Sequence, residues 1–582
     1  MNRLFGIIKI NLNQEVLKPN IFPQKHYAWE RVWNNSSYFI GNQDISKSDN
    51  NIAEEKSTLV IFQGNLFYES DKETAAKIIL NRYKKQENLS FVKNLNGSFN
   101  FLLLDKTQKS IFLVTDKYGS KPLFVYTDKE KFIFGSEVKY ILSLLNNRPT
   151  INWEAWGQYL TFRSTLGDNT FYHGIRLISN GTILKIKYGE KVVVSKKEYW
   201  DFSQIHIDYD KSFEEKISEG VEIFRDVFGE LGRVTGNFKS IVALSGEFDS
   251  RSIVCGLKKY SPLKNFDTAT TLHPCGSEKE IVLEIVNALS LKNIYINRPK
   301  NIYRDFFIKK AYLTDCLVQE HLWIMPLLDI AKNYDVYIDG IPGDIIMRST
   351  RVRPIHIEKK DNAIFLAKLF KKQFGFEFDW LKSYIDENIW NQIKYSEDWT
   401  IDELNKIRPT ENRMVVFLMK NRVKNSLNLL PNNIIGSSVK NVFQPFFNDN
   451  IVRFGLSIPH EYKFKFIYRQ IINKAFPEIE NIRSTSDENL EKLKNYDQKI
   501  LQFDQNPREL ISDYLTISPS DSNFLFNLLK KLPSPTFLNK QKFLNDTGAN
   551  PIIHKVNTLL EIILWFNMFE NKKLNKEFIS AL

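Results

Sequence analysis

Residues 238–255 constrain the fold of this chain more than any other stretch. They read as an apolar strand up to Leu244, a tight turn of small residues from Ser245 to Ser250, and then a helix. A turn at a helix N-terminus offers phosphate a row of backbone amides and a positive dipole, and Asp249 can hold Mg²⁺. The sequence therefore predicts a phosphate-binding loop. The alternative is an ordinary turn in which Asp249 or Ser250 caps the helix.

The sequence around this turn alternates between helical patterns and short apolar runs from Phe213 onward. The runs are residues 240–244, 264–271, 293–297 and 336–339, with segments between them that are long enough for crossover helices. This alternation predicts a parallel α/β sheet. Such sheets bind ligands at the carboxyl ends of their strands, where the turns at 245–250 and 340–344 would both lie. We therefore expect the two turns to face one site.

The sequence before about residue 200 reads as short strands and turns. Runs of β-branched and aromatic residues lie at 58–62, 97–104, 110–114, 122–126 and 131–134, which predicts a β-rich region. A helix is expected at 72–86, where Ala75, Ile79 and Tyr83 share a face. We place a first domain at 1–205 and a second at 206–582. The second should be mostly helical beyond about residue 360, with a mobile loop at 484–504.

Composition excludes several classes of protein. No apolar run is long enough to span a bilayer. The net charge of +12 comes from lysine pairs scattered among acidic residues, which argues against a nucleic-acid partner. The eight histidines show no zinc-ligand spacing. The N-terminus lacks a secretory signal, and the three cysteines, Cys255, Cys275 and Cys316, fit buried reduced thiols. We therefore expect a cytoplasmic protein without a membrane partner.

Further motifs are spread over most of the chain. They are Asn96-Gly97-Ser98-Phe99, residues 115–123, Ser136-Glu137, and Pro445-Phe446-Phe447-Asn448-Asp449. Together with the turns at 244–250 and 340–344, they resemble the asparagine synthetase family, including its relatives that close β-lactam rings or cyclise lasso peptides. The resemblance implies an N-terminal Ntn-hydrolase-like αββα sandwich. A parallel α/β domain of the adenine-nucleotide alpha-hydrolase (PP-loop) kind, with a helical C-terminal part, would follow it.

The resemblance also implies an activity and its residues. ATP would bind Leu244, Ser245, Gly246, Asp249, Ser250, Thr271, Gly340 and Gly343, and Mg²⁺ would bind Asp249 and Asp344. A substrate carboxylate would attack the α-phosphorus of ATP. An amine or ammonia would then capture the acyl-adenylate, giving an amide, AMP and pyrophosphate. The acyl donor, a small-molecule or peptide carboxylate, is not identified by the sequence, and a homo-oligomeric state stays open.

The first domain departs from the family where glutaminase chemistry would occur. The family's nucleophile is an N-terminal cysteine. Here Asn2 follows Met1, and Phe5 takes the cysteine's place when residues 5–7 are aligned with the family's Cys-Gly-Ile. Residues 63–65 read Gln-Gly-Asn where the family has Asn-Gly-Glu. Since a phenyl ring has no lone pair to attack an amide, the sequence predicts that glutamine is not hydrolysed.

The second domain departs from the family at several positions. Glu247 replaces a glycine of the loop, and it would repel pyrophosphate by about 1 to 4 kcal/mol unless it points away or pairs with Arg251 or a metal. Ile341 and Ile345 stand where the family has polar residues. A lysine that stabilises charge in the family's transition state has no clear counterpart. Its candidate substitutes are Arg483, Lys463 and Lys465, which join Asp249 as candidate catalytic residues.

These departures leave two readings of function. The favoured one is an ATP-dependent amide-forming ligase without glutaminase activity, because Ser245, Asp249, Ser250 and Asp344 are all retained. The other is a catalytically silent relative that keeps the fold for regulation or protein interaction. Sulphur or tRNA chemistry at the same kind of loop is a third, less favoured use.

Overall fold

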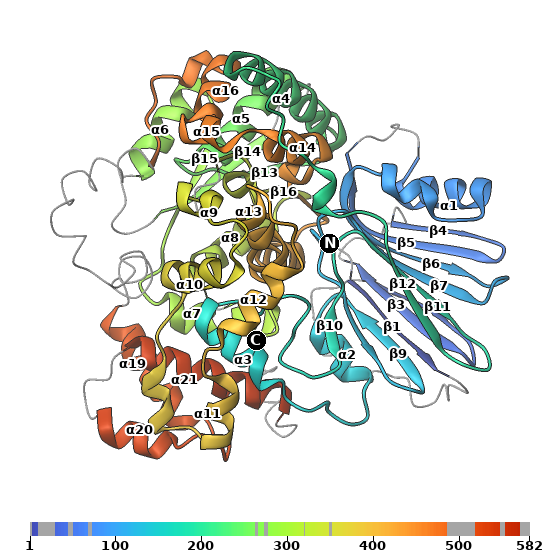
Figure 1. The fold of residues 1–582 in the computed structure, drawn as a ribbon, viewed down its shortest axis with the longest axis vertical. Helices are drawn as coiled ribbons and strands as arrows, with labels where there is room; N and C mark the ends of the chain where they lie inside the picture. The colour runs from blue at the N-terminus through green and yellow to red at the C-terminus, as the bar shows by residue number, and fades with distance from the viewer. Residues whose placement is uncertain are drawn as a thin grey trace.

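The computed structural model describes residues 3–9, 29–44, 51–67, 73–261, 266–272, 278–318, 320–348, 352–485, 518–547 and 553–570. Figure 1 shows two stacked β-sheets on one side of the molecule and a mixed helical and sheet region on the other. No helix within these ranges is long and apolar enough to cross a membrane.

The stacked sheets are antiparallel and have six strands each. The first has the order β10-β8-β9-β1-β3-β2, and the second β12-β11-β7-β6-β5-β4. The strands are β1 (Arg3–Lys9), β2 (Trp29–Asn34), β3 (Tyr38–Asp44), β4 (Ile52–Glu55), β5 (Thr58–Leu66), β6 (Gly97–Asp105), β7 (Ser110–Thr115), β8 (Phe124–Thr127), β9 (Lys131–Gly135), β10 (Ile175–Leu177), β11 (Thr182–Lys187) and β12 (Val193–Glu198).

Apolar residues lie on both faces of these sheets, because successive side chains of a strand point to opposite faces. In β1, Leu4 and Ile8 join the core between the two sheets, with residues such as Ile61 of β5. Phe5 and Ile7 face the other way, toward α2 (Val138–Leu144) and α3 (Trp153–Phe162). The outer face of the second sheet packs on α1 (Ala75–Gln86). The layers are therefore helix, sheet, sheet, helix (Figure 1).

The second region is built on a parallel five-stranded sheet of order β15-β14-β13-β16-β17. Its strands are β13 (Ser240–Ala243), β14 (Phe266–Leu272), β15 (Asn293–Asn297), β16 (Val336–Ile338) and β17 (Asn441–Phe443). The chain runs outward from β13 to β15 and then returns to β16 on the other side of β13. The strand order thus reverses between β13 and β16, which is where open α/β sheets bind ligands.

Helices surround this sheet and form most of the chain beyond it. They are α4 (Phe213–Thr235), α5 (Phe248–Tyr260), α6 (Glu278–Leu289), α7 (Ile302–Leu313), α8 (Met325–Ala331), α9 (Pro354–Glu358), α10 (Ala363–Phe374), α11 (Glu387–Ile393), α12 (Glu397–Asn405), α13 (Arg413–Leu418), α14 (Asp449–Ser457), α15 (His460–Phe464), α16 (Ile467–Ala475), α19 (Pro519–Lys531), α20 (Lys540–Thr547) and α21 (Ile553–Trp565). A π-helix, η6, spans Asp344–Arg348.

The structure confirms the predicted strands and the parallel sheet, with shifted ends. The strand predicted at 58–62 extends to Leu66, and the helix predicted from 72 begins at Ala75, because the Thr74 side chain caps it. Strands β1 to β4, β10 to β12 and β17 were not predicted. Cys255 and Cys316 are buried free thiols, as expected, whereas Cys275 lies outside the described residues. So does most of the loop predicted at 484–504, and the domain boundary at 205 stays a prediction.

Candidate functional site

The predicted phosphate-binding loop lies between β13 and α5 and is held by its own serines. The Ser245 amide donates to Ser250 Oγ (2.9 Å), the two hydroxyls lie 2.9 Å apart, and the Glu247 amide reaches Ser245 Oγ (3.3 Å). The strand leading into the loop is fixed to its neighbour, since Leu244 accepts a hydrogen bond from Thr270 Oγ1 (2.8 Å). The two serines therefore fix the shape of the loop.

The two predicted turns meet at one place, as expected. The Asp344 amide donates to Asp249 Oδ2 at 2.7 Å, across 95 residues of chain. Gly340 and Gly343 permit this approach. A Cβ on Gly343 would lie 2.6 Å from Asp249 Cγ, and one on Gly340 would lie 3.0 Å from Asp249 Cβ. Any side chain at Gly343 would push the two turns apart.

Asp249 is the electrostatic centre of this site. Burial and the nearby carboxylate of Asp344 raise the pKa of Asp249 well above its usual value. The Tyr468 hydroxyl, on α16, donates to Asp249 Oδ1 (3.0 Å) and favours the charged form. A cation bound between the two carboxylates would offset this repulsion.

The residues present fit a magnesium ion that arrives with phosphate. In the described ranges no group of three or more His, Cys, Asp or Glu side chains is placed to hold a metal. Mg²⁺, however, is usually held by one or two carboxylates together with water and substrate phosphates. Asp249 and Asp344 provide those two carboxylates beside the loop.

Glu247, the acidic residue that replaces a loop glycine, forms an ion pair with Arg348. Arg348 Nη1 lies 2.7 Å from Glu247 Oε2, and the guanidinium lies over the Phe248 ring at 5.1 Å. Arg251, the partner considered from the sequence, donates instead to the carbonyls of Gly246 (3.0 Å), Ile482 and Arg483 (both 2.8 Å). The carboxylate is thus paired, but with a residue 101 positions along the chain.

An acidic side chain already lies on the amides of the loop. The Gly246 amide donates to Glu278 Oε1 of α6 at 3.2 Å. On the other side, the Thr485 amide donates to the Gly246 carbonyl (3.3 Å). Glu278 therefore occupies the kind of position that a phosphate oxygen would take, and a bound phosphate would have to displace it.

The three candidate substitutes for the missing lysine lie in different surroundings. Lys463 is buried and donates to the Ile346 carbonyl (3.0 Å), and burial lowers its pKa to about 7. Lys465 is exposed. Arg483 has a half-exposed side chain (51%), 3.9 Å from Glu280. None of these contacts reaches Asp249 or Asp344, whereas Arg348, which the sequence did not suggest, lies beside the loop.

The remaining predicted ATP ligands lie at strand ends next to the loop. Leu244 is buried directly after β13. Thr271 is partly exposed near the carboxyl end of β14, which pairs with β13. Both positions suit contacts to the nucleoside part of a ligand whose phosphates lie at the loop.

Phe5, which the sequence aligns with the family's nucleophilic cysteine, is a core residue. Phe5 is fully buried and stacks on Tyr140 of α2, with ring centroids 5.1 Å apart. Nearby, the Gln63 amide donates to Ser136 Oγ (2.9 Å), and the Asn65 amide donates to the Val442 carbonyl (3.0 Å) in β17. Both side-chain amides therefore donate to acceptors within the protein.

Lys121 links the region of the two stacked sheets to the region of the parallel sheet. It is buried, and its Nζ donates to Asn432 Oδ1 (2.8 Å) and to the Val442 carbonyl (3.1 Å). Burial is the main reason that its pKa falls to about 7. A lysine of the first region thus holds the edge strand of the parallel sheet.

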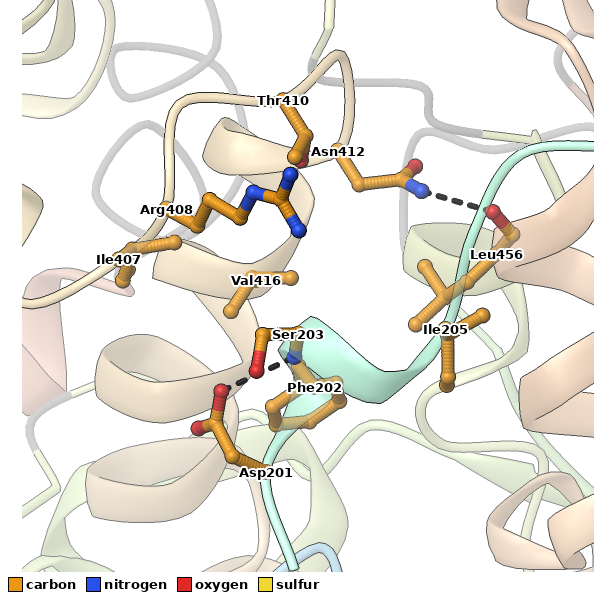
Figure 2. A pocket seen from close by; sticks show the side chains of 10 residues that line it. All are labelled: Asp201, Phe202, Ser203, Ile205, Ile407, Arg408, Thr410, Asn412, Val416 and Leu456. Atoms are coloured by element: carbon orange, nitrogen blue, oxygen red, sulfur yellow. Dashed lines mark hydrogen bonds between the residues drawn. The ribbon is translucent and has the colours of Figure 1, made fainter.

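A small cavity lies away from this site, between residues 201–205 and the segment around α13 (Figure 2). Its volume is about 20 Å³, which admits roughly one water. Asn412 on its wall donates to the Leu456 carbonyl (2.7 Å). A cavity of this size is too small for a substrate.

Comparison with known proteins finds similarity to amidotransferases and asparagine synthetases. Residues 57–200 match the model of a glutamine amidotransferase domain. A protein of Methanocaldococcus jannaschii, provisionally named asparagine synthetase [glutamine-hydrolyzing] 2, is 28% identical over 204 residues, covering 34% of this chain and 38% of that protein. Asparagine synthetase [glutamine-hydrolyzing] 1 of Bacillus subtilis is 24% identical over 257 residues, covering 41% and 39%. The chain is related to the asparagine synthetases.

The relationship is partial. The matches span 38% and 39% of the length of these two relatives, less than half of each. Among solved structures, glutamine phosphoribosylpyrophosphate amidotransferase from Bacillus subtilis matches with a TM-score of 0.24 and 10% identity, over 46% of this chain and 65% of that chain. A score this low carries no argument, so the case for function rests on the residues of the site.

Proposed function

We propose that this protein is an ATP-dependent ligase that forms an amide bond and has no glutaminase activity. The observation that carries the proposal is the meeting of Asp249 and Asp344, 2.7 Å apart from amide to carboxylate, at the point where the strand order reverses. The second region would then be a PP-loop domain. Asparagine synthetases among its relatives support this class of reaction.

The proposed reaction has two steps, activation of a carboxylate and its capture by an amine. A substrate carboxylate displaces pyrophosphate from the α-phosphorus of ATP, forming an acyl-adenylate. An amine or ammonia then displaces AMP from the acyl carbon, and the amine loses a proton. Mg²⁺, when bound, would offset the charge of the departing pyrophosphate. The acyl donor would be a small-molecule or peptide carboxylate.

The residues of the chain contribute position and charge. Asp249 and Asp344 would hold the cation, with Tyr468 fixing the rotamer of Asp249 through its hydrogen bond. Ser245 and Ser250 hold the loop in shape so that amides at the start of α5 face the phosphates. Gly340 and Gly343 keep the second turn close to Asp249. Leu244 and Thr271 would contact the nucleoside.

Phe5 supports the absence of glutaminase activity. Its buried ring fills the expected position of the nucleophile, and Gln63 and Asn65 direct their amides to protein acceptors. Ammonia would then come from solution, or the substrate would be an amine. An assay of glutamine hydrolysis by the purified protein tests this part, and measurable glutamate release would contradict it.

Titration calorimetry with ATP and Mg²⁺ tests the ligase. We expect saturable, Mg²⁺-dependent binding that Asp249→Ala abolishes. The control is Asp226→Ala, which removes a carboxylate of α4 that is 68% exposed. Pyrophosphate release in the presence of candidate carboxylates and amines would then identify the substrate. Equal binding by Asp249→Ala and the control would reject the assigned site.

One observation favours a second function, a silent relative used for regulation or interaction. The loop carries its own acidic groups, since Glu278 accepts from the Gly246 amide and Glu247 lies at the start of α5. If these carboxylates exclude phosphate, no binding would be seen at millimolar ATP. That outcome would replace the ligase proposal with this one.

A further inference from the structure

The charges around the loop are unbalanced for a site that binds polyphosphate. Four carboxylates lie at or beside it: Glu247, Asp249, Glu278 and Asp344. Two of them suit Mg²⁺, but Mg²⁺ alone leaves about half of the charge of a triphosphate without a partner. A fixed cation close to the loop is therefore expected.

We infer that Arg348 is the fixed cation that contacts the polyphosphate, and that Glu247 holds it in place until the phosphate arrives. The inference rests on the proposed function. Arg348 ends the π-helix that starts at Asp344, so the turn that supplies one metal carboxylate also supplies this guanidinium. Its side chain is 18% exposed, compared with 34% for Glu247.

The contacts of Arg348 orient it for this role. The Phe248 ring lies beneath the guanidinium at 5.1 Å, which fixes its plane, and Nη1 donates to Glu247 Oε2 at 2.7 Å. Phe248 is the first residue of α5, so the guanidinium lies at the helix end where phosphate is expected. The positive charge of Arg348 also lowers the pKa of Asp249, which places it within electrostatic reach of the proposed metal ligand.

Glu247 can give up Arg348 without being buried as a lone charge. A guanidinium has five N–H donors and binds carboxylate and phosphate in the same geometry. A phosphate oxygen can therefore replace Glu247 Oε2, and the partly exposed carboxylate can turn toward water. Glu247 thus keeps the arginine oriented in the free protein.

Other cations near the loop are committed elsewhere. Arg251 donates to three backbone carbonyls and holds Ile482 and Arg483 against the loop. Lys463 donates to the Ile346 carbonyl on the π-helix, and burial lowers its pKa to about 7. Arg348 pairs with a side chain that can be exchanged, which distinguishes it from both.

The test is titration calorimetry of the full chain with magnesium pyrophosphate and with Mg·ATP. We expect Arg348→Ala to weaken both affinities about tenfold or more, and Arg348→Lys to recover part of the loss, because a lysine keeps the charge but loses the fork. The matched control is Lys258→Ala, which removes one exposed positive charge from the far end of α5. Thermal unfolding checks that each variant is folded.

Glu247→Gln is the second variant and keeps Arg348 in place. We expect it to tighten pyrophosphate binding by about threefold to tenfold, because the amide holds the guanidinium less strongly. In the Arg348→Ala background the same change should tighten binding less. Equal tightening in both backgrounds would mean that Glu247 only repels phosphate, and would overturn the exchange.

The outcomes separate this inference from the proposed function. Binding by the wild type, with Arg348→Ala equal to Lys258→Ala, would overturn the role of Arg348 and leave the ligase intact. Binding by neither the wild type nor Glu247→Gln would overturn both. Loss confined to Arg348→Ala, with partial recovery in Arg348→Lys, would support the inference.

Discussion

The surroundings of Phe5 in the first region and of Asp249 in the second differ in how they are packed and charged. At the first, Phe5 fills the space with a buried ring and the neighbouring amides bond to protein acceptors. At the second, Asp249 and Asp344 keep their approach, and the acidic replacement Glu247 is paired with Arg348. The first place is packed as core, while the second holds several charged groups close together.

The largest expected effect is on the filled site. Phe5→Ala should destabilise the protein by about 3 to 5 kcal/mol, since it leaves a cavity beneath Tyr140. Urea unfolding measures the change, with Phe466→Ala as control, because that phenylalanine is 58% exposed. A loss below about 1 kcal/mol would mean that Phe5 is not a core residue, and would weaken the contrast between the two sites.

The next effect concerns the retained site. Asp344→Asn keeps the shape of the turn and removes its charge, so we expect Mg·ATP affinity to fall about a hundredfold, or roughly 2.7 kcal/mol. The raised pKa of Asp249 should fall at the same time, because one of its causes is the carboxylate of Asp344. Calorimetry at several pH values measures both. Unchanged affinity would place the metal elsewhere.

A third prediction concerns the contact between the regions. The buried Lys121 has a pKa of about 7 when folded, below its unfolded value near 10.5. Between these values the unfolded state binds more protons, so stability should rise with pH from about 7 to 10. Lys121→Met should reduce the slope of the unfolding free energy against pH by an amount that corresponds to about one bound proton at most. Lys463→Met, a lysine with a similar pKa, is the comparison in the second region. An unchanged pH slope in Lys121→Met would contradict the assignment.

The smallest effect comes from Tyr468→Phe. Loss of one hydrogen bond to Asp249 should weaken Mg·ATP binding about threefold to fivefold, near 1 kcal/mol. Tyr172→Phe removes a hydroxyl bonded to Glu570, far along the chain from the loop, and serves as the matched control. A loss equal to that of the control would show that Tyr468 does not position Asp249.

The sequence predicted the parallel sheet and the meeting of the two turns, because both depend on local patterns that recur at strand ends. It could not predict the partner of Glu247. Arg348 reaches the loop through a π-helix whose turn directs its fourth side chain after Asp344 back toward α5. Nor could it show that Lys463 is buried, because Arg483, Lys463 and Lys465 look alike as a sequence, and the burial of Lys463 arises only where α15 packs against the π-helix.

Strand β1 was not predicted, for a related reason. In β1, all but the last residue are buried, so the alternation that marks a half-exposed strand is absent. The bonds of Gln63 and Asn65 join residues more than seventy positions apart. Contacts of this range follow from the packing of the two regions and leave no local signal.

The bonds from Asn65 and Lys121 to Val442 have a consequence for any attempt to shorten the protein. Both side chains reach β17, the outermost strand of the parallel sheet. A fragment without the first region would leave the edge of β17 uncovered, and an uncovered edge strand can pair with another copy of the chain. The first region therefore covers an edge of the second, a role that does not depend on glutaminase chemistry.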